Sequence, residues 1–172
     1  MSFLVTLARF VSTTSRLTGR LVAVLCTVVV YVMLGLLLTQ VLMRYFLGAP
    51  PSWTEELAII LFAWLVLLYA TVGVRENFHV RIETIPHRFT RLRRLSDRIA
   101  AAFIFGFGLV SLVAGLNYVD RTSGQKSAAL QLPIEALYYS VPVCGALLIL
   151  HASALLLESA MSGNSDTSVT PA

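Results

Sequence analysis

The chain has 172 residues, of which 57% are hydrophobic and only 13% are charged, and its mean hydropathy is +0.79. A soluble domain is about 45–50% apolar and about 25% charged, so one water-soluble core cannot bury this much apolar surface. We therefore expect an integral membrane protein. The net charge of +4 lies in short connecting segments, so nucleic acid is not an expected partner.

The N-terminal segment comes first along the chain. Residues 3–20 place apolar side chains at helical spacing between Arg9, Arg16 and Arg20. This pattern predicts a short amphipathic helix on the membrane surface ahead of the first span. A frayed tail is the alternative for the same residues.

Charged residues delimit four apolar stretches, each close to the roughly 20 residues that cross a bilayer as a helix. Their charge-free parts are residues 21–43, 57–74, 99–119 and 136–157. With the interfacial residues around Trp53 and after Pro133 added, the expected spans are about 21–43, 53–74, 99–119 and 134–157. They predict a single four-helix membrane domain over residues 1–160, followed by a flexible cytoplasmic tail over residues 161–172.

Lysine and arginine are unevenly distributed between the connecting segments. Of the 13 such residues, the segment before the first span and the loop between the second and third spans hold all but Arg44, Arg121 and Lys126. The positive-inside rule then places both termini and the middle loop in the cytoplasm. The predicted fold class is an all-α integral membrane protein with four transmembrane helices and with N-terminal and middle-loop amphipathic cytoplasmic helices.

The loop between the first two spans contains helix stop and start signals. Pro50 and Pro51 end the first helix, and Ser52 with Glu55 forms a capping box for the second. Glu55 and Glu56 then lie in a first turn, where the helix dipole favours negative charge. Contact with a basic surface of a partner is the alternative for these two carboxylates. Trp53 suits the aromatic belt at the membrane interface.

The middle loop predicts no metal site, because His79 and His87 have no further ligand at a suitable spacing. From His87 onward the sequence predicts a helix that runs into the third span. Its basic stripe has steps of three or four residues and consists of Arg88, Arg91, Arg94 and Arg98. Such a stripe attracts anionic phospholipid, and docking on another subunit is the second possibility.

The last two spans carry packing and kinking signals. Gly108, Ser111 and Gly115 share one face of the third span, and small residues at this spacing let helices approach closely. Pro142 predicts a kink in the fourth span. His151, near the end of that span, is expected to be a packed neutral imidazole.

Between their flanking charged residues, the four apolar stretches contain no Asp, Glu, Lys or Arg. Ion-coupled carriers and proton pumps place ionisable groups or broken helices near the bilayer midplane. A small multidrug exporter, the nearest four-helix alternative, needs a carboxylate in its first span. Cys26 and Cys144 each lie inside an apolar run, which favours inert thiols. We therefore expect no enzyme activity and no cofactor.

Several motifs stand in a characteristic order along the chain. They are Arg44-Tyr45, the run Trp53-Thr54-Glu55-Glu56-Leu57-Ala58, the run His79-Val80-Arg81-Ile82-Glu83, and Ala129-Leu130-Gln131-Leu132-Pro133 followed by Tyr138 and Pro142. In this order they resemble the small membrane subunit of TRAP transporters, the DctQ-type family, over roughly residues 15–158. Glu83 departs from the Asp that is frequent in the family, and Cys144 departs from a frequent Gly.

The resemblance implies a role in a tripartite, sodium-driven importer of organic acids or related solutes in the bacterial inner membrane. Its partners would be a large TRAP membrane transport subunit and a periplasmic substrate-binding protein. The small subunit would be a scaffold that braces the large one and helps dock the binding protein, through contacts that we expect at Arg44, Trp53, Glu55, Glu56 and His79. A stand-alone four-span carrier or structural membrane protein is the alternative function.

Overall fold

Long helices make up most of the chain. The computed structural model describes the backbone of residues 2–48, 51–80 and 90–162, and the side chains of residues 10–48, 51–75 and 95–157. The helices are α1 (Ser2–Leu47), α2 (Ser52–Val80), α3 (Thr90–Thr122), α4 (Glu135–Tyr138) and α5 (Ser140–Ser162). Over these described ranges the only strand-like pairing is an isolated bridge between Lys126 and Pro133. The predicted all-α fold is confirmed.

Four segments are long and apolar enough to cross a membrane. They are Phe10–Leu47, Ser52–Arg75, Leu95–Thr122 and Glu135–Leu157. They coincide with the four predicted spans, and the helices run past the predicted limits because a charge at a membrane edge does not end a helix. α1, for example, continues past Arg44 to Gly48, whose φ of 69° is a left-handed conformation that glycine adopts readily and that ends helices.

The N-terminal segment differs from its prediction. Residues 3–20 are not a separate surface helix but the first part of α1, which continues without a break into the first span. Ser15 is only 1% exposed, and Gly19 packs beside Arg75 and His151. The segment therefore belongs to the bundle, because its buried face contacts α2 and α5. Of the predicted C-terminal tail, α5 includes residues up to Ser162, and residues 163–172 lie outside the described ranges.

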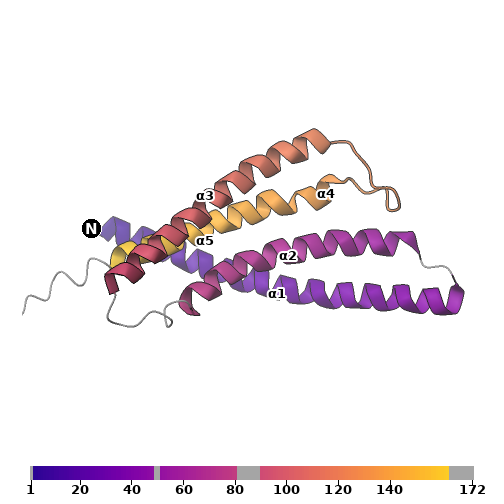
Figure 1. Ribbon diagram of the computed structural model, residues 1–172, viewed down its shortest axis with the longest axis horizontal. Coiled ribbons are helices and arrows are strands. Elements are labelled where there is room, and N and C mark those ends of the chain that lie inside the picture. The colour runs from indigo at the N-terminus through magenta and orange to yellow at the C-terminus, as the bar shows by residue number, and fades with distance from the viewer. Residues whose placement is uncertain (1, 49–50, 81–89, 163–172) are drawn as a thin grey trace, which may run out of the picture.

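Two helical hairpins cross at one end of the molecule. α1 pairs with α2, and α3 pairs with α4 and α5; the hairpins lie together near the start of α1 and diverge toward the opposite end (Figure 1). We call these the N-terminal end and the loop end; the loop end holds the α1–α2 turn and the connection over residues 123–134. α5 is central, since it contacts α1, α2 and α3. Half of its apolar span is buried, against 11–17% in the other three spans.

A small apolar core lies where α1, α2 and α5 meet. Val22 and Cys26 of α1 pack against Leu68 and Val72 of α2, with Leu147 of α5 alongside. The second free cysteine, Cys144, is buried on α5, and its thiol donates a hydrogen bond to the Leu67 carbonyl of α2 over 3.3 Å. Most remaining apolar side chains of the spans face outward, which suits a protein whose solvent is lipid.

α3 packs on α5 through positions that lack a side chain. A Cβ at Gly108 would lie 3.0 Å from the Gly145 carbonyl oxygen, and one at Gly115 would lie 2.7 Å from Cδ of Pro142. On the α5 side, a Cβ at Gly145 would lie 2.6 Å from the amide nitrogen of Leu112. Two of the three small residues predicted for helix packing, Gly108 and Gly115, are thus placed directly against α5, while Ser111 is half-buried.

The fourth span is interrupted near the predicted position. α4 ends at Tyr138 and α5 begins at Ser140, two residues before Pro142. Proline has no backbone N–H to donate to the carbonyl four residues earlier, so the ladder of the helix is weakest there. Tyr139 keeps helical angles, and its N–H donates to the Glu135 carbonyl over 2.9 Å, so the two pieces form one span.

We predict that Gly145→Ala destabilises the bundle, because the added Cβ meets backbone atoms of α3 that cannot move alone. The expected loss is about 1–3 kcal/mol. Thermal unfolding in detergent can be followed by thiol labelling, since Cys26 and Cys144 are buried in the folded protein. Gly106→Ala is the matched control, because no atom lies within 4 Å of its added Cβ. Equal unfolding temperatures for the two variants would contradict this packing.

Candidate functional site

Three threonine hydroxyl groups in the apolar parts of the spans are bonded to their own helices. Thr27 donates to the Ala23 carbonyl over 3.0 Å, Thr39 to the Gly35 carbonyl over 2.8 Å and Thr71 to the Leu68 carbonyl over 2.7 Å. In lipid, a polar group needs a partner within the protein because no water is available. These hydroxyls are therefore used by the helices themselves, and the remaining polar chemistry lies at the two ends of the bundle.

A buried polar cluster joins three helices at the N-terminal end. Oγ of Ser15 on α1 lies 2.8 Å from Nδ1 of His151 on α5, and Arg75 on α2 donates a hydrogen bond to the same Oγ. Ser15 and His151 are each 1% exposed. A guanidinium can only donate, so Ser15 accepts from Arg75 and is free to donate its own proton to Nδ1. We assign His151 as the neutral tautomer with its proton on Nε2.

This cluster holds the ends of α1, α2 and α5 in a fixed relation. Nε2 of His151 is buried without a hydrogen-bond partner among the described residues, so the ring acts here through Nδ1. The sequence predicted His151 as a packed neutral imidazole but did not connect Ser15 or Arg75 with it. The sequence contained only one indication that the three residues meet: each lies near the end of its predicted span on the same side of the membrane.

Carboxylates tie the loop end together. Oε2 of Glu56 accepts hydrogen bonds from the backbone N–H groups of Ala129 at 3.0 Å and Leu130 at 2.8 Å. These bonds attach the connection over residues 123–134 to the first turn of α2. At the other end of the connection, Glu135 of α4 accepts from the Gly124 N–H over 2.9 Å. Each bond involves a charged acceptor, and such bonds are about twice as strong as neutral ones.

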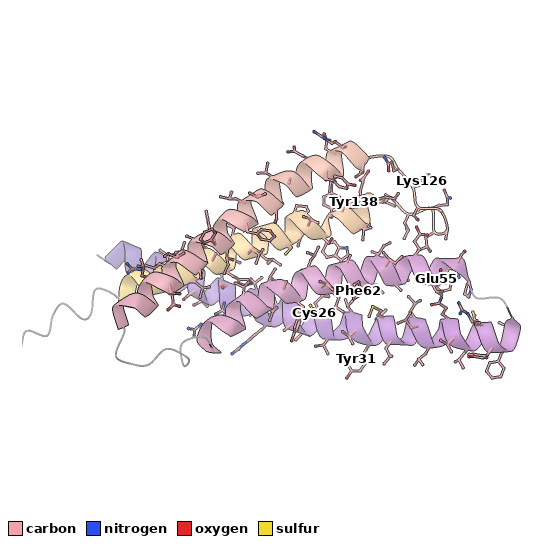
Figure 2. The ribbon with its side chains drawn as sticks, viewed as in Figure 1. Cys26, Tyr31, Glu55, Phe62, Lys126 and Tyr138 are labelled. Atoms are coloured by element: carbon pink, nitrogen blue, oxygen red, sulfur yellow. The ribbon has the colours of Figure 1, made fainter. Side chains whose placement is uncertain are left out.

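Glu55 and Glu56 point to different parts of the chain, although they are adjacent. Successive residues on a helix are about 100° apart, so the two carboxylates face different neighbours. Oε1 of Glu55 accepts from the Gln40 amide over 3.0 Å and so links α2 to α1. Figure 2 places Glu55 at the loop end of α2. Both carboxylates therefore have hydrogen-bond partners within the chain, and contact with another protein stays a prediction for them.

The other predicted contact residues are spread over both ends. Arg44 and Trp53 are exposed at the loop end, with Trp53 at the start of α2. His79 lies in the last part of α2, and its side chain falls outside the described ranges. The structure therefore brings Arg44 and Trp53 to one end and leaves His79 at the other.

The basic stripe is described only at its end. Arg88 lies outside the described residues, and the side chains of Arg91 and Arg94 are likewise not described. α3 does begin at Thr90 and runs without interruption into the third span, with Arg98 exposed. A helix is thus present where the stripe was predicted, and the binding of lipid or protein by the stripe stays a prediction.

Large apolar side chains cover the outer faces of α1 and α3. Tyr31 points away from the bundle (Figure 2) and is 70% exposed. Phe103 on α3 is 76% exposed. Phe107 and Val110 continue the same face of α3. Faces of this kind fit lipid or another membrane subunit. Among the residues whose side chains are described, no group of three His, Cys, Asp or Glu is placed to hold a metal ion.

Comparison with known proteins gives a family and several relatives. The family described as "Tripartite ATP-independent periplasmic transporters, DctQ component" matches residues 33–161. The C4-dicarboxylate TRAP transporter small permease protein DctQ of Vibrio cholerae is 32% identical over 80 residues, which are 46% of this chain and 34% of that protein. The sialic acid TRAP transporter small permease protein SiaQ of the same organism is 26% identical over 119 residues, or 68% of each chain.

A third relative matches this chain over only a small part of its own length. A segment of 104 residues, 60% of the present chain, is 29% identical to the sialic acid TRAP transporter permease protein SiaT of Haemophilus influenzae, of which it makes up only 16%. The similarity to Vibrio cholerae DctQ likewise spans about a third of that protein's length.

We predict that Ser15→Ala lowers the stability of the bundle, because Nδ1 of His151 and an N–H of Arg75 lose their shared partner. An unsatisfied buried polar group costs about 1–3 kcal/mol. Ser153→Ala is the matched control on α5, since the Ser153 hydroxyl donates only to the Leu150 carbonyl of its own helix, over 2.8 Å. Thermal unfolding in detergent compares the two, and a loss as large in Ser153→Ala would argue against a special role for Ser15.

Glu56→Ala is expected to free the connection over residues 123–134 from α2, because the amides of Ala129 and Leu130 lose their acceptor. Hydrogen–deuterium exchange should become severalfold faster at these amides. Glu55→Ala removes the same charge next to it but leaves those amides bonded, and it serves as the control. Unchanged exchange at Ala129 and Leu130 in Glu56→Ala would show that Glu56 does not hold the connection.

Proposed function

The chain belongs to the DctQ-component family of tripartite ATP-independent periplasmic transporters, and from this membership we propose that it is the small accessory subunit that braces a large transport subunit. The complex that we propose is a sodium-driven importer of organic acids or related solutes that also uses a periplasmic substrate-binding protein. In this proposal the ion and substrate sites belong to the large subunit.

One observation carries the proposal of a large partner. A segment similar to this chain makes up only 16% of the SiaT permease protein of Haemophilus influenzae. In that relative, the homologous segment is covalently joined to the rest of a permease. We infer that the present chain is the corresponding component and packs against a large permease in the same way.

The geometry supports a bracing role. The hydroxyls of Thr27, Thr39 and Thr71 are bonded to their own helices, and buried or charge-assisted hydrogen bonds fix both ends of the bundle. α5 is the most buried of the four spans, and the apolar faces of α1 and α3 are exposed to partners. A frame of this kind gives a moving partner a fixed surface, since packed helices resist deformation.

The solute class follows from the relatives' names. Those names give C4-dicarboxylate for DctQ and sialic acid for SiaQ, and both of these solutes carry carboxylate groups. We infer an organic acid for the complex that contains this chain. The choice among such acids would be made by the binding protein and the large subunit.

The distribution of charge supports an orientation. All of the 13 Lys and Arg residues except Arg44, Arg121 and Lys126 lie before the first span or between the second and third spans. Under the positive-inside rule, the N-terminal end faces the cytoplasm and the loop end faces the periplasm. Arg44, Trp53 and the two carboxylates would then face the binding protein. His79 and the basic stripe would face the large subunit or anionic phospholipid on the cytoplasmic side.

We predict that the chain co-purifies with a large polytopic permease encoded next to it. A tagged chain, expressed with that permease and extracted in mild detergent, should retain it through size-exclusion chromatography. Another four-span membrane protein carrying the same tag is the control for detergent-driven association. Recovery of the chain without the permease would favour the stand-alone alternative.

Arg44→Ala and Trp53→Ala are expected to weaken capture of the solute-loaded binding protein severalfold without reducing the yield of the membrane complex, because both side chains are exposed at the loop end. Surface plasmon resonance on complexes in nanodiscs measures this step. Arg16→Ala removes the same charge from an exposed position at the N-terminal end and is the control. Equal capture by all variants would exclude this part of the loop end as the docking surface.

A further inference from the structure

A pocket of about 400 Å³ lies at the loop end, between α2 and the connection that leads from α3 to α4. One wall is the first turns of α2, with Glu56, Ile59 and Ile60. The other wall includes Lys126 from the connection and Leu137 from α4. Figure 2 shows Lys126 in the connection and Tyr138 on the α4 side of the pocket.

The wall formed by the connection is held in place by several hydrogen bonds. Glu56 accepts from two of its amides, as described above. The Ser127 N–H donates to the Leu132 carbonyl over 2.8 Å, and the Ile134 N–H donates to the Gln125 carbonyl over 3.0 Å. The connection therefore has a defined shape, and the pocket is formed before any ligand enters it.

Both walls change from charged to apolar in the same direction. Glu56, Ile59 and Ile60 lie on one face of α2, because residues three and four apart on a helix are neighbours. Ile60 lies about 6 Å deeper than Glu56 along the helix, at 1.5 Å per residue. On the facing wall, Lys126 is exposed in the connection, while Ile134 and Leu137 lie closer to the span. A molecule that fits such a pocket has a charged head and an apolar tail.

The charges of Lys126 and Glu56 determine which kind of lipid head group the pocket favours. The ammonium of Lys126 attracts a phosphate, whereas the carboxylate of Glu56 repels one and attracts a cation. A carboxylate has about four acceptor sites, and the amides of Ala129 and Leu130 occupy two of those on Glu56. The remaining sites favour an ammonium with N–H groups to donate. A quaternary ammonium has none, and an anionic glycerol head has no cation.

We propose that this pocket binds one phospholipid with an ethanolamine head, its phosphate at Lys126, its ammonium at Glu56 and one acyl chain against Ile59 and Ile60. The site differs from the basic stripe, whose described residue, Arg98, lies near the start of the third span at the opposite end of the bundle. The proposal depends on the chain spanning a membrane and does not depend on its role in a transporter.

Lipid titration of the purified 172-residue chain tests the site. Native mass spectrometry in detergent compares phosphatidylethanolamine, phosphatidylcholine and phosphatidylglycerol with identical acyl chains. We expect one ethanolamine lipid to bind at least about fivefold more tightly than either of the others, which is the effect of one charge contact near a membrane surface. Equal binding of all three lipids, or a preference for phosphatidylglycerol, would overturn the proposal.

Matched variants locate the binding. Lys126→Gln should weaken binding of phosphatidylethanolamine about fivefold. Arg121→Gln makes the same charge change at an exposed site in the last turn of α3, and it should have no effect because Arg121 does not line the pocket. Equal effects of the two variants would show a general attraction of lipid to positive charge, which contradicts the proposed site.

Two further variants separate the ligand contacts from the role of Glu56 in holding the connection. Glu56→Gln should abolish the preference for phosphatidylethanolamine over phosphatidylcholine. Glu55→Gln should keep this preference, because Glu55 bonds to Gln40 of α1 and does not line the pocket. Ile60→Trp fills the apolar part of the pocket without changing a charge, and it should reduce binding of the ethanolamine lipid. If Ile60→Trp binds the lipid as well as the unmodified chain does, the pocket is not a phospholipid site. The same conclusion would follow if a photoreactive group at position 60 labelled a co-expressed protein and no lipid.

Discussion

The need to satisfy every polar group without water determines how this protein is organised. Within the apolar spans, the hydroxyls of Thr27, Thr39 and Thr71 bond to carbonyls of their own helices. Groups that bond between helices lie mainly toward the ends, where Ser15 meets Arg75 and His151 and where Glu56 meets the connection over residues 123–134. The middle of the bundle is left to apolar packing, and the two ends determine how the helices are placed.

Packing around α5 completes this arrangement. α3 can approach α5 closely because Gly108, Gly115 and Gly145 have no side chains at the contact. α1 and α2 reach α5 from the other side through the core around Cys26 and Leu68. Because α5 occupies the centre, the other three spans present their outer faces to the surroundings. A bundle built in this way offers a rigid apolar surface, which agrees with the accessory role proposed above.

The sequence was sufficient for the features that depend on composition and local pattern. The four spans follow from the spacing of charged residues, the end of α1 from the two prolines that follow it, and the close approach of α3 from Gly108 and Gly115. The family was also identifiable, because its motifs keep their order along the chain. The limits of the helices were not predictable in the same way, since α1 includes the segment predicted as a separate surface helix.

Contacts between distant segments could not be predicted, because no local pattern encodes them. The partners of Glu56 are backbone amides that are more than 70 residues away and have no side-chain signature. The same holds for Trp64, whose indole N–H donates to the Ala136 carbonyl over 2.8 Å. The Ser15, Arg75 and His151 cluster required knowing that α1, α2 and α5 meet at one end. The pocket beside α2 exists only because the connection folds back onto Glu56.

The central claim is that this chain supports transport without providing the path for the solute. Uptake of a labelled C4-dicarboxylate or sialic acid into proteoliposomes under a sodium gradient, with the matching binding protein present, tests it most directly. Vesicles that contain only this chain should take up no more solute than empty vesicles, and vesicles that contain it together with the large subunit should accumulate solute. Sodium-dependent accumulation by the chain alone would contradict the account.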